Sequence, residues 1–309
     1  RPIHLQACVE AGVHVFAEKP MAVDAPGVRK VLAAGEEARR KNLSFVSGFE
    51  TRYSEASRQV VEQIRDGAIG DIVSIHTTYN TGPLWHRGRD PQWTDMEFQL
   101  RNWYYFTWLS GDHLVEQHVH YNDLTCWIMN EKAPLHAWGY GGRAQRTESQ
   151  FGDIFDHHAV VYEYDNGVRY FAFTRQQSKC FNENSKVIFG TRGKLVSQRG
   201  WALCDASGKQ VWEPTADPKH PELNCFEEMF AAMRAGAPIN DSLTMAHSSM
   251  HAILGRMATH SGQRVTWDDG IASNLELAPE VYSLTAAPPV QPDADGNYPF
   301  AVPGQAVAF

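Results

Sequence analysis

The chain contains 309 residues and carries a formal net charge of −8, with 43% hydrophobic and 21% charged residues. These values permit a full hydrophobic core and two domains, whereas the lack of a basic block argues against nucleic acid as a partner. No apolar run approaches the ~18 residues of a membrane span, and five scattered cysteines without a C-x-x-C pair argue against a disulfide framework or a zinc knuckle.

The first fifty residues are predicted to alternate helices with buried strands. This alternation is typical of a doubly wound parallel sheet. Because the strands of such a sheet expect neighbours on both sides, we expect the amino-terminal part of this domain to precede Arg1. The helices are expected over residues 4–11 and 25–41, the second with Asp24 as its N-cap, and the strands over residues 13–17 and 43–49.

The tripeptide Glu18-Lys19-Pro20 directly follows the first predicted strand. The carboxyl ends of parallel strands are where open α/β sheets place their ligands. A lysine at that point is held in position, and partial burial lowers its pKa toward values useful for proton transfer. The competing interpretation is a surface Glu-Lys pair ahead of a helix-starting proline.

Beyond residue 70 the pattern changes to strands joined by turns. The segment Tyr164-Asp165-Asn166-Gly167-Val168 carries the Asn-Gly signal of a β-hairpin. We therefore predict an α/β part, an α+β part with a large, mostly antiparallel open sheet, and a proline-rich extended tail. The predicted boundaries are residues 1–68, 69–285 and 286–309. The strands are expected over 72–79, 135–141, 159–164, 168–174 and 186–189, and further helices over 54–66, 222–235 and 242–261.

A helix that begins near residue 112 and continues to residue 129 is predicted to carry a polar stripe, because residues three and four apart share a helix face. The stripe consists of His113, Glu116, Gln117, His120 and Asp123. Three interpretations remain open. The first is acid–base catalysis by His120, oriented by Asp123 or Glu116. The second is a metal site with His113, Glu116 and His120 as ligands, and the third is a buried polar network without chemistry.

Several segments match one known family in order and spacing. Glu18-Lys19-Pro20 matches its E-K-P motif, and Glu116-x-His118-x-His120-x-x-Asp123 matches its D-x-G-x-H-x-x-D helix. Arg1-Pro2-Ile3-His4 is similar to its T-P-x-H segment, and residues 49–53 resemble a strand-end segment that contains an arginine. On these residues the chain resembles the Gfo/Idh/MocA oxidoreductases. The resemblance implies a partial Rossmann domain followed by a sheet domain, with NAD or NADP as the cofactor.

The resemblance also implies roles for individual residues. The implied catalytic residues are Lys19, His120, Asp123 and Glu116. The implied cofactor-binding residues are Glu18, Lys19, Pro20 and Arg52. Two departures stand out, because Glu116 replaces the usual aspartate and His118 the usual glycine. The resemblance also calls for a G-x-G-x-x-G segment, which the sequence does not contain.

The activity implied by the resemblance is hydride transfer between NAD(P) and a hydroxyl of a sugar, cyclitol or related polyol. Aromatic and basic side chains suit the wall of a sugar site. The predicted substrate contacts are Trp85, Arg87, Trp103, Tyr104, His157 and Arg175. A homo-oligomer that associates through the open sheet is also expected.

Three other functions remain compatible with the sequence. A redox-cycling glycosidase would oxidise a sugar transiently and return the electrons to the product. A metal-dependent hydrolase or lyase would use His113, Glu116 and His120. A non-catalytic sugar-binding relative would use neither set. We favour the oxidoreductase over these three, and we expect its catalytic site to contain no metal ligands.

Overall fold

The computed structural model describes residues 1–308, and its first part forms a small parallel sheet of two strands. The side chain of Asp24 accepts a hydrogen bond from the amide of Gly27 at 2.7 Å, and this bond caps the second helix as expected. The elements are, in chain order, α1 (Pro2–Glu10), β1 (Val15–Ala17), α2 (Ala25–Arg40) and β2 (Phe45–Ser47).

A segment from far along the chain extends this small sheet. The amide of Phe45 donates to the carbonyl of Ile239, and the amide of Asp241 donates to the carbonyl of Phe45, both at 2.8 Å. Residues 239–241 therefore lie parallel to β2 and pair with it at its outer edge. The long helix α9 (Ser242–Ser261) begins immediately after this segment.

Nine strands form a second, larger sheet in the order β10-β9-β8-β7-β3-β6-β5-β4-β11. Neighbouring strands run antiparallel except β3 and β6, which are parallel. The prediction of a small parallel sheet followed by a large, mostly antiparallel one is thus confirmed. The strands are β3 (Ile72–Thr81), β4 (His136–Gly142), β5 (His157–Glu163), β6 (Arg169–Gln176), β7 (Glu183–Gly190), β8 (Gly193–Ser197), β9 (Trp201–Asp205), β10 (Gln210–Trp212) and β11 (Val265–Thr266).

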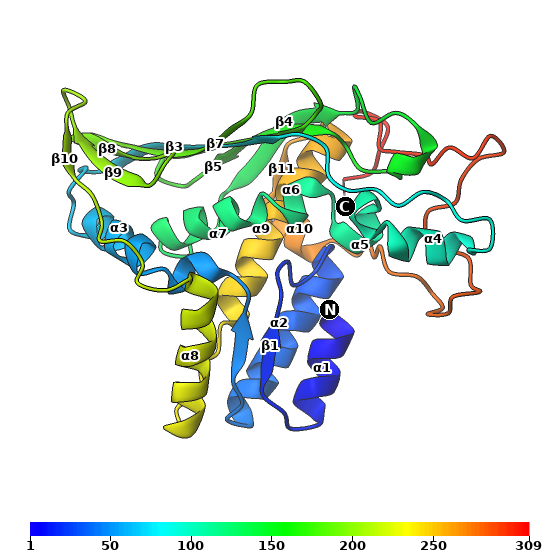
Figure 1. Cartoon of the computed structure of the whole chain (residues 1–309), viewed down its shortest axis with the longest axis horizontal. Helices are drawn as coiled ribbons and strands as arrows, with labels where there is room; N and C mark the ends of the chain where they lie inside the picture. Colours follow the sequence, from blue (N-terminus) through cyan, green and yellow to red (C-terminus); the bar gives the residue numbers. More distant parts are fainter. Residues whose placement is uncertain (309) are drawn as a thin grey trace.

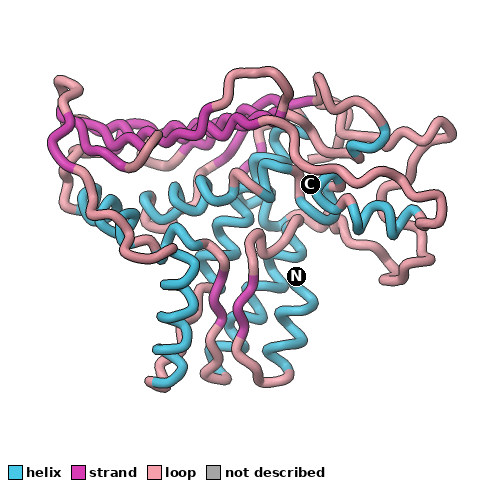
Figure 2. Tube along the Cα trace, viewed as in Figure 1, coloured by secondary structure: helices cyan, strands magenta, loops and turns pink. Residues whose placement is uncertain are grey.

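Helices cover one face of the large sheet, and no α-helix of residues 1–308 covers the other (Figure 1; Figure 2 gives the same view by element type). Strand alternation separates the two faces. On β6, Tyr170 and Thr174 are buried against the helices, whereas Phe171 and Phe173 point to the uncovered face. Helix α9 is buried along most of its length, because it packs against α2, α7 and β4 at once.

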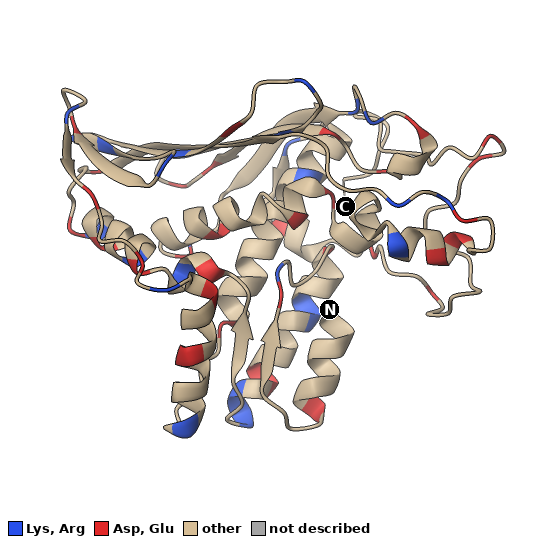
Figure 3. Cartoon of the chain, viewed as in Figure 1, with Lys and Arg blue, Asp and Glu red and all other residues tan. Residues whose placement is uncertain are grey.

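The remaining helices surround this arrangement, and charged residues are interspersed on the outer ones, including α2, α4 and α8 (Figure 3). Within the described residues, we find no helix that combines the length and the apolarity needed to cross a bilayer. These helices are η1 (Glu50–Tyr53), α3 (Glu55–Arg65), α4 (Asp95–Arg101), η2 (Trp103–Tyr105), α5 (Thr107–Ser110), α6 (His113–Glu116), α7 (Val119–Ile128), η3 (Ser149–Phe151), α8 (Pro221–Arg234) and α10 (Trp267–Ala272).

The proline-rich tail packs against an aromatic cluster of its own chain. Tyr298 is 6% exposed, and its ring meets that of Phe106 edge-on with 4.9 Å between centroids. The side-chain amide of Gln99 donates to the carbonyl of Val290 at 2.6 Å. Residues 286–308 contain no helix or strand.

Candidate functional site

The predicted helix over residues 112–129 is interrupted. Asp112 caps α6 by accepting from the amide of His113, but the chain turns after Glu116 and resumes as α7 at Val119. The amide of His118 reaches back to the carbonyl of His113, which is one residue farther than in a regular α-helix. The residues of the predicted polar stripe therefore do not share one helix face, and they contact different partners.

Lys19 and Glu116 meet at the junction between the small sheet and α6. The Nζ atom of Lys19 lies 2.9 Å from Oε1 of Glu116 and also donates to the backbone carbonyl of Glu116. Burial raises the pKa of Glu116, and the charge of Lys19 opposes that shift. The Oε2 atom of Glu116 is buried without a hydrogen-bond partner among residues 1–308, so it is free to accept a proton from a bound hydroxyl.

His120 lies within electrostatic range of Lys19. Its Nδ1 atom is 3.4 Å from Oε2 of Glu50, and its ring packs edge-on against Phe49. Burial lowers the pKa of His120 to about 3, with smaller contributions from the positive charges of Lys19 and Lys186. The imidazole is therefore neutral at physiological pH, so its ring can accept a hydrogen bond from a substrate hydroxyl.

Lys186 and Glu50 are two site residues that the sequence reasoning did not identify. Lys186 pairs across the sheet with Thr77, which faces the helices, and its ammonium lies 4.3 Å from the ring centroid of Tyr121. Burial lowers the pKa of Lys186 to about 8, whereas burial raises the pKa of Glu50. Glu50 follows the carboxyl end of β2, and this position is the one sequence signal that could have identified it. For Lys186 the sequence predicts a strand, but it does not show whether the side chain points toward the helices or toward the uncovered face of the sheet.

Arg52 and Asp123 bind each other, and this is a correction to both assignments. The Nε atom of Arg52 donates to both carboxylate oxygens of Asp123, at 2.9 and 3.1 Å, and Nη1 donates to Glu131 at 2.7 Å. Asp123 also accepts from Ser248 at 2.7 Å. The side chains assigned to the cofactor and to His120 are thus occupied in a buried network that joins η1, α7 and α9. Glu50, rather than Asp123, is the carboxylate nearest to His120.

The predicted aromatic wall forms a separate cluster beside η2. Trp85 and Trp103 lie 6.0 Å apart between ring centroids, and the guanidinium of Arg87 lies 5.8 Å from the centroid of Trp85. Tyr104 is buried, and its hydroxyl accepts from Gln176 at 2.6 Å. These contacts hold the four predicted residues together, but none of them is with Lys19, Glu116 or His120.

His157 and Arg175 lie on the uncovered face of the large sheet. They are cross-strand partners, and Arg175 shares its face with Phe171 and Phe173. The neighbouring residue of each, His158 and Thr174, points toward the helices instead. Because successive strand residues alternate between faces, the structure does not bring the predicted pair to Lys19 and His120.

The other predicted cofactor residues lie at the carboxyl end of β1. Glu18 is exposed, and its carboxylate comes so close to Gly48 that a Cβ there would meet Oε2 at 2.4 Å. Pro20 is buried, and the residues after it line a cavity of about 740 Å³ that opens beside the start of α1. The walls of this cavity include Pro2, His4, Met21, Asp24, Trp108 and Leu284.

The metal site predicted from His113, Glu116 and His120 does not form. Nδ1 of His113 faces the carboxylate of Asp112 and the carbonyl of Phe155, at 3.0 and 3.1 Å. Glu116 faces Lys19 and His120 faces Glu50. The three side chains thus have separate partners because the break after α6 sends them in different directions.

Comparison with known proteins identifies the sheet-forming part first. Residues 57–196 match the GFO/IDH/MocA C-terminal domain. This part of the chain is thus a Gfo/Idh/MocA C-terminal domain. Among curated relatives, a 2,7-anhydro-N-acetylneuraminate hydratase of Escherichia coli is 26% identical over 185 residues, covering 59% of this chain and 44% of the relative. Inositol 2-dehydrogenase 3 of Saccharopolyspora erythraea is 26% identical over 166 residues, covering 54% and 42% respectively.

Solved structures of the Gfo/Idh/MocA fold extend the match. An aldose-aldose oxidoreductase from Caulobacter crescentus, complexed with glycerol, superposes with a TM-score of 0.66 at 18% identity and covers 86% of this chain and 75% of its own. A levoglucosan dehydrogenase in complex with NADH and levoglucosan gives a TM-score of 0.65 at 18% identity, with coverage of 86% and 77%. The first curated relatives are matched over only 42–48% of their own lengths, so this chain spans less than half of each.

Proposed function

We propose that this Gfo/Idh/MocA chain is part of an NAD(P)-dependent oxidoreductase that acts on a hydroxyl of a sugar, cyclitol or related polyol. One observation carries the proposal: Lys19 at the end of β1 meets Glu116 at the end of α6, and the neutral imidazole of His120 lies beside them. The ammonium provides a hydrogen-bond donor for a substrate oxygen, and the imidazole provides a base for its proton.

The residues present fit the reactive end of a nicotinamide cofactor. Glu18 and Lys19 lie at the carboxyl end of a parallel strand, and the cavity of about 740 Å³ adjoins the residues after Pro20. Such a cofactor, when bound, accepts or donates the hydride. In the oxidation direction, Lys19 holds the substrate oxygen, and His120 takes the hydroxyl proton on its uncharged ring.

The substrate class is supported by the names of relatives rather than by contacts. Two inositol dehydrogenases and a levoglucosan dehydrogenase are among the similar proteins, and all act on ring-bearing polyols by their names. Several polar side chains surround His120, as recognition of a polyol requires: Lys19, Glu50, Glu116 and Lys186.

The test uses the full-length protein and a panel of inositols, aldoses and anhydro sugars with NAD or NADP. Reduced cofactor should accumulate with at least one member of the panel. Lys19→Met and His120→Asn should each lower kcat by about 100-fold or more, as expected for loss of a general acid–base group. If both variants turned over at the wild-type rate, the proposal would be wrong.

A redox-cycling hydratase or glycosidase is the second candidate, and Glu50 and Lys186 favour it. An elimination needs additional groups that exchange protons near neutral pH, and the pKa of Lys186 is about 8 while that of Glu50 is raised. The E. coli hydratase is an example of a relative named for such chemistry. Product formation that depends on catalytic NAD without accumulation of NADH would select this candidate over the dehydrogenase.

A further inference from the structure

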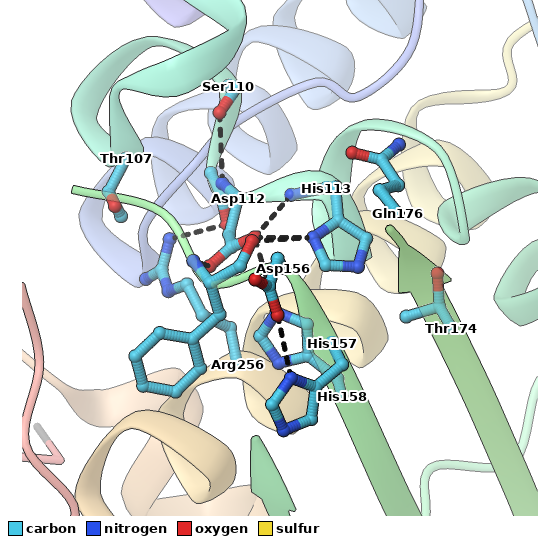
Figure 4. Close-up of polar contacts among 12 residues, drawn as sticks. Thr107, Ser110, Asp112, His113, Asp156, His157, His158, Thr174, Gln176 and Arg256 are labelled. Atoms are coloured by element: carbon cyan, nitrogen blue, oxygen red, sulfur yellow. Dashed lines mark hydrogen bonds and ion pairs between the residues drawn. The ribbon is translucent and has the colours of Figure 1, made fainter. Parts of the chain in front are cut away.

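A buried carboxylate outside the proposed site is surrounded by imidazoles. Asp112 has no exposed surface, and its backbone adopts φ 80°, which turns its side chain inward from the start of α6 (Figure 4). Its Oδ1 atom lies 3.2 Å from Nε2 of His158, and Oδ2 lies 2.9 Å from Nε2 of His260. One ligand-type atom from each of the three residues falls within 4.8 Å of the other two. They come from α6, β5 and α9, which are distant in sequence.

The proton positions around His158 can be assigned from its neighbours. The hydroxyl of Thr259 has one hydrogen, which it donates to the carbonyl of Gly255 or Arg256. Its oxygen therefore accepts at 2.9 Å from Nδ1 of His158, so the proton of the neutral ring is on Nδ1. Nε2 then presents a lone pair.

That lone pair has no partner in the described chain. Nε2 of His158 is fully buried, and it forms no hydrogen bond within residues 1–308 although a carboxylate oxygen of Asp112 lies 3.2 Å away. A lone pair and a carboxylate cannot face each other in a buried place without a positive charge between them. Either a proton or a metal cation must supply that charge.

The geometry favours the metal over the proton. A proton on Nε2 would require the carboxylate oxygen to lie close to the N–H direction, and here it does not meet hydrogen-bond geometry. A metal ion on the lone-pair axis holds its other ligands away from that axis. In a tetrahedral zinc site with bonds of about 2.1 Å, the ligand atoms are roughly 3.4 Å apart. The 3.2 Å separation of Asp112 from His158 is near this value, whereas the 2.9 Å contact with His260 is a hydrogen bond whose proton a bound ion would displace.

The carboxylate of Asp112 also accepts from the amides of His113 and Phe155 and from Nδ1 of His113, but none of these donors satisfies Nε2 of His158. The guanidinium of Arg256 donates to the carbonyls of Gly111 and Val23 instead of to the carboxylate. His113 is not a ligand through Nδ1, because that atom also faces the carbonyl of Phe155 and so carries the proton. The set is therefore two imidazole nitrogens and one carboxylate.

We propose that Asp112, His158 and His260 bind a divalent transition-metal ion of the zinc class. Two imidazoles and a carboxylate suit zinc, cobalt or a related ion. The side chain of His260 is 13% exposed, so water can reach the ion from that side as a fourth ligand. The ion ties the start of α6 to β5 and to the end of α9. Because α6 ends at Glu116, the ion fixes the helix that brings Glu116 to Lys19.

The experiment measures metal binding by the full-length protein, independently of any catalytic activity. Protein stripped with a chelator is titrated with Zn²⁺ and, in a second arm, with Co²⁺, whose visible d–d bands report a tetrahedral nitrogen and oxygen site. We expect about one equivalent of either ion to bind, a zinc-dependent rise in Tm, and bands that disappear when zinc displaces cobalt.

Variants assign the ligands. His158→Gln and His260→Gln should each weaken Co²⁺ binding by about 100-fold or more. His157→Gln is the matched control, since it lies next to His158 on β5 but points to the other face of the sheet, and it should bind Co²⁺ as the wild type does. If folded wild-type protein, verified by circular dichroism, shows no cobalt band and no zinc stabilisation, the cluster is an imidazolium–carboxylate network and the proposal is wrong. Equal loss of binding in the His157 variant would also overturn it.

Discussion

The Nζ atom of Lys19 lies 2.9 Å from Oε1 of Glu116, although 97 positions separate the two residues. Their side chains are only 15% and 9% exposed, so water screens the pair weakly. The contact joins the end of β1 to the end of α6 and so fixes the two halves of the proposed site against each other.

Removing one partner of this pair should destabilise the protein more than removing both partners together. Lys19→Met leaves the Glu116 carboxylate buried and unpaired, and Glu116→Gln leaves an unpaired ammonium, so each should lower the free energy of unfolding by about 1–3 kcal/mol. The double variant Lys19→Met/Glu116→Gln should lose clearly less than the sum of the two. Urea unfolding of the four proteins measures the coupling. Strict additivity would show that the pair contributes nothing.

The neutral state of His120 should appear in the pH dependence of activity. Burial lowers the pKa of His120 from its ordinary value of 6.5 to about 3. The imidazole therefore stays uncharged at pH values well below 6.5. The kcat/KM profile for alcohol oxidation should therefore lack an acid limb near pH 6.5 that depends on His120. His120→Asn removes the base, whereas His220→Asn, whose ring is largely exposed at the start of α8, serves as the control and should leave kcat unchanged. An acid limb near pH 6.5 that vanishes only in the His120 variant would contradict the assignment.

Lys186 should make stability rise with pH in the alkaline range. Its pKa is lowered by burial to about 8 from an ordinary 10.5, so between these pH values the unfolded chain binds a proton that the folded chain has released. Stability increases with pH wherever the unfolded state binds more protons. From pH 7.5 to 10, the wild type should therefore gain ~1–3 kcal/mol relative to Lys186→Met. Parallel denaturant titrations give the difference, and identical curves for the two proteins would refute the lowered pKa.

Arg52 and Asp123 should act on stability more than on chemistry. Arg52 gives two hydrogen bonds to Asp123 and one to Glu131 in a buried place, so Arg52→Met and Asp123→Asn should each cost about 2–4 kcal/mol. At temperatures where the variants remain folded, kcat should stay within about threefold of the wild type, in contrast to the losses of about 100-fold expected at His120. A large loss of kcat in either variant, with an unchanged urea midpoint, would show that Arg52 or Asp123 takes part in catalysis.

The uncovered sheet face should mediate self-association. Tyr140 is 69% exposed there, and Phe173, its counterpart two strands away on the same face, is 38% exposed. Tyr140→Glu places a charge in this apolar stripe and should shift the oligomer toward monomer in light-scattering chromatography. Tyr282→Glu, at a comparably exposed tyrosine in an irregular segment near the tail, should not. A monomeric wild type, or an unchanged oligomer in the first variant, would exclude this surface.

Local patterns were sufficient for much of the fold. Apolar runs and the capping residue Asp24 predicted α2, α3, β1 and β2 to within a few residues, because their signals are local. Short strands such as β10, with exposed Gln210 and Val211, were not predicted because their pairing depends on β9 rather than on their own pattern.

The site was only partly predictable for a related physical reason. Lys19 and His120 were identified because each belongs to a recognisable motif. The break after α6 was not expected, and it redirects Glu116, His120 and Asp123 to different partners. The face to which His157 and Arg175 point depends on the strand register, which no single strand determines.

The pairing of β2 with residues 239–241 has a consequence for biosynthesis. During translation, the early strand emerges long before its neighbour, and its edge stays open until nearly two hundred further residues have been synthesised. Contacts so distant along the chain form slowly and leave strand edges exposed in the meantime. We therefore expect the nascent amino-terminal half to depend on chaperones until the ribosome has released Asp241.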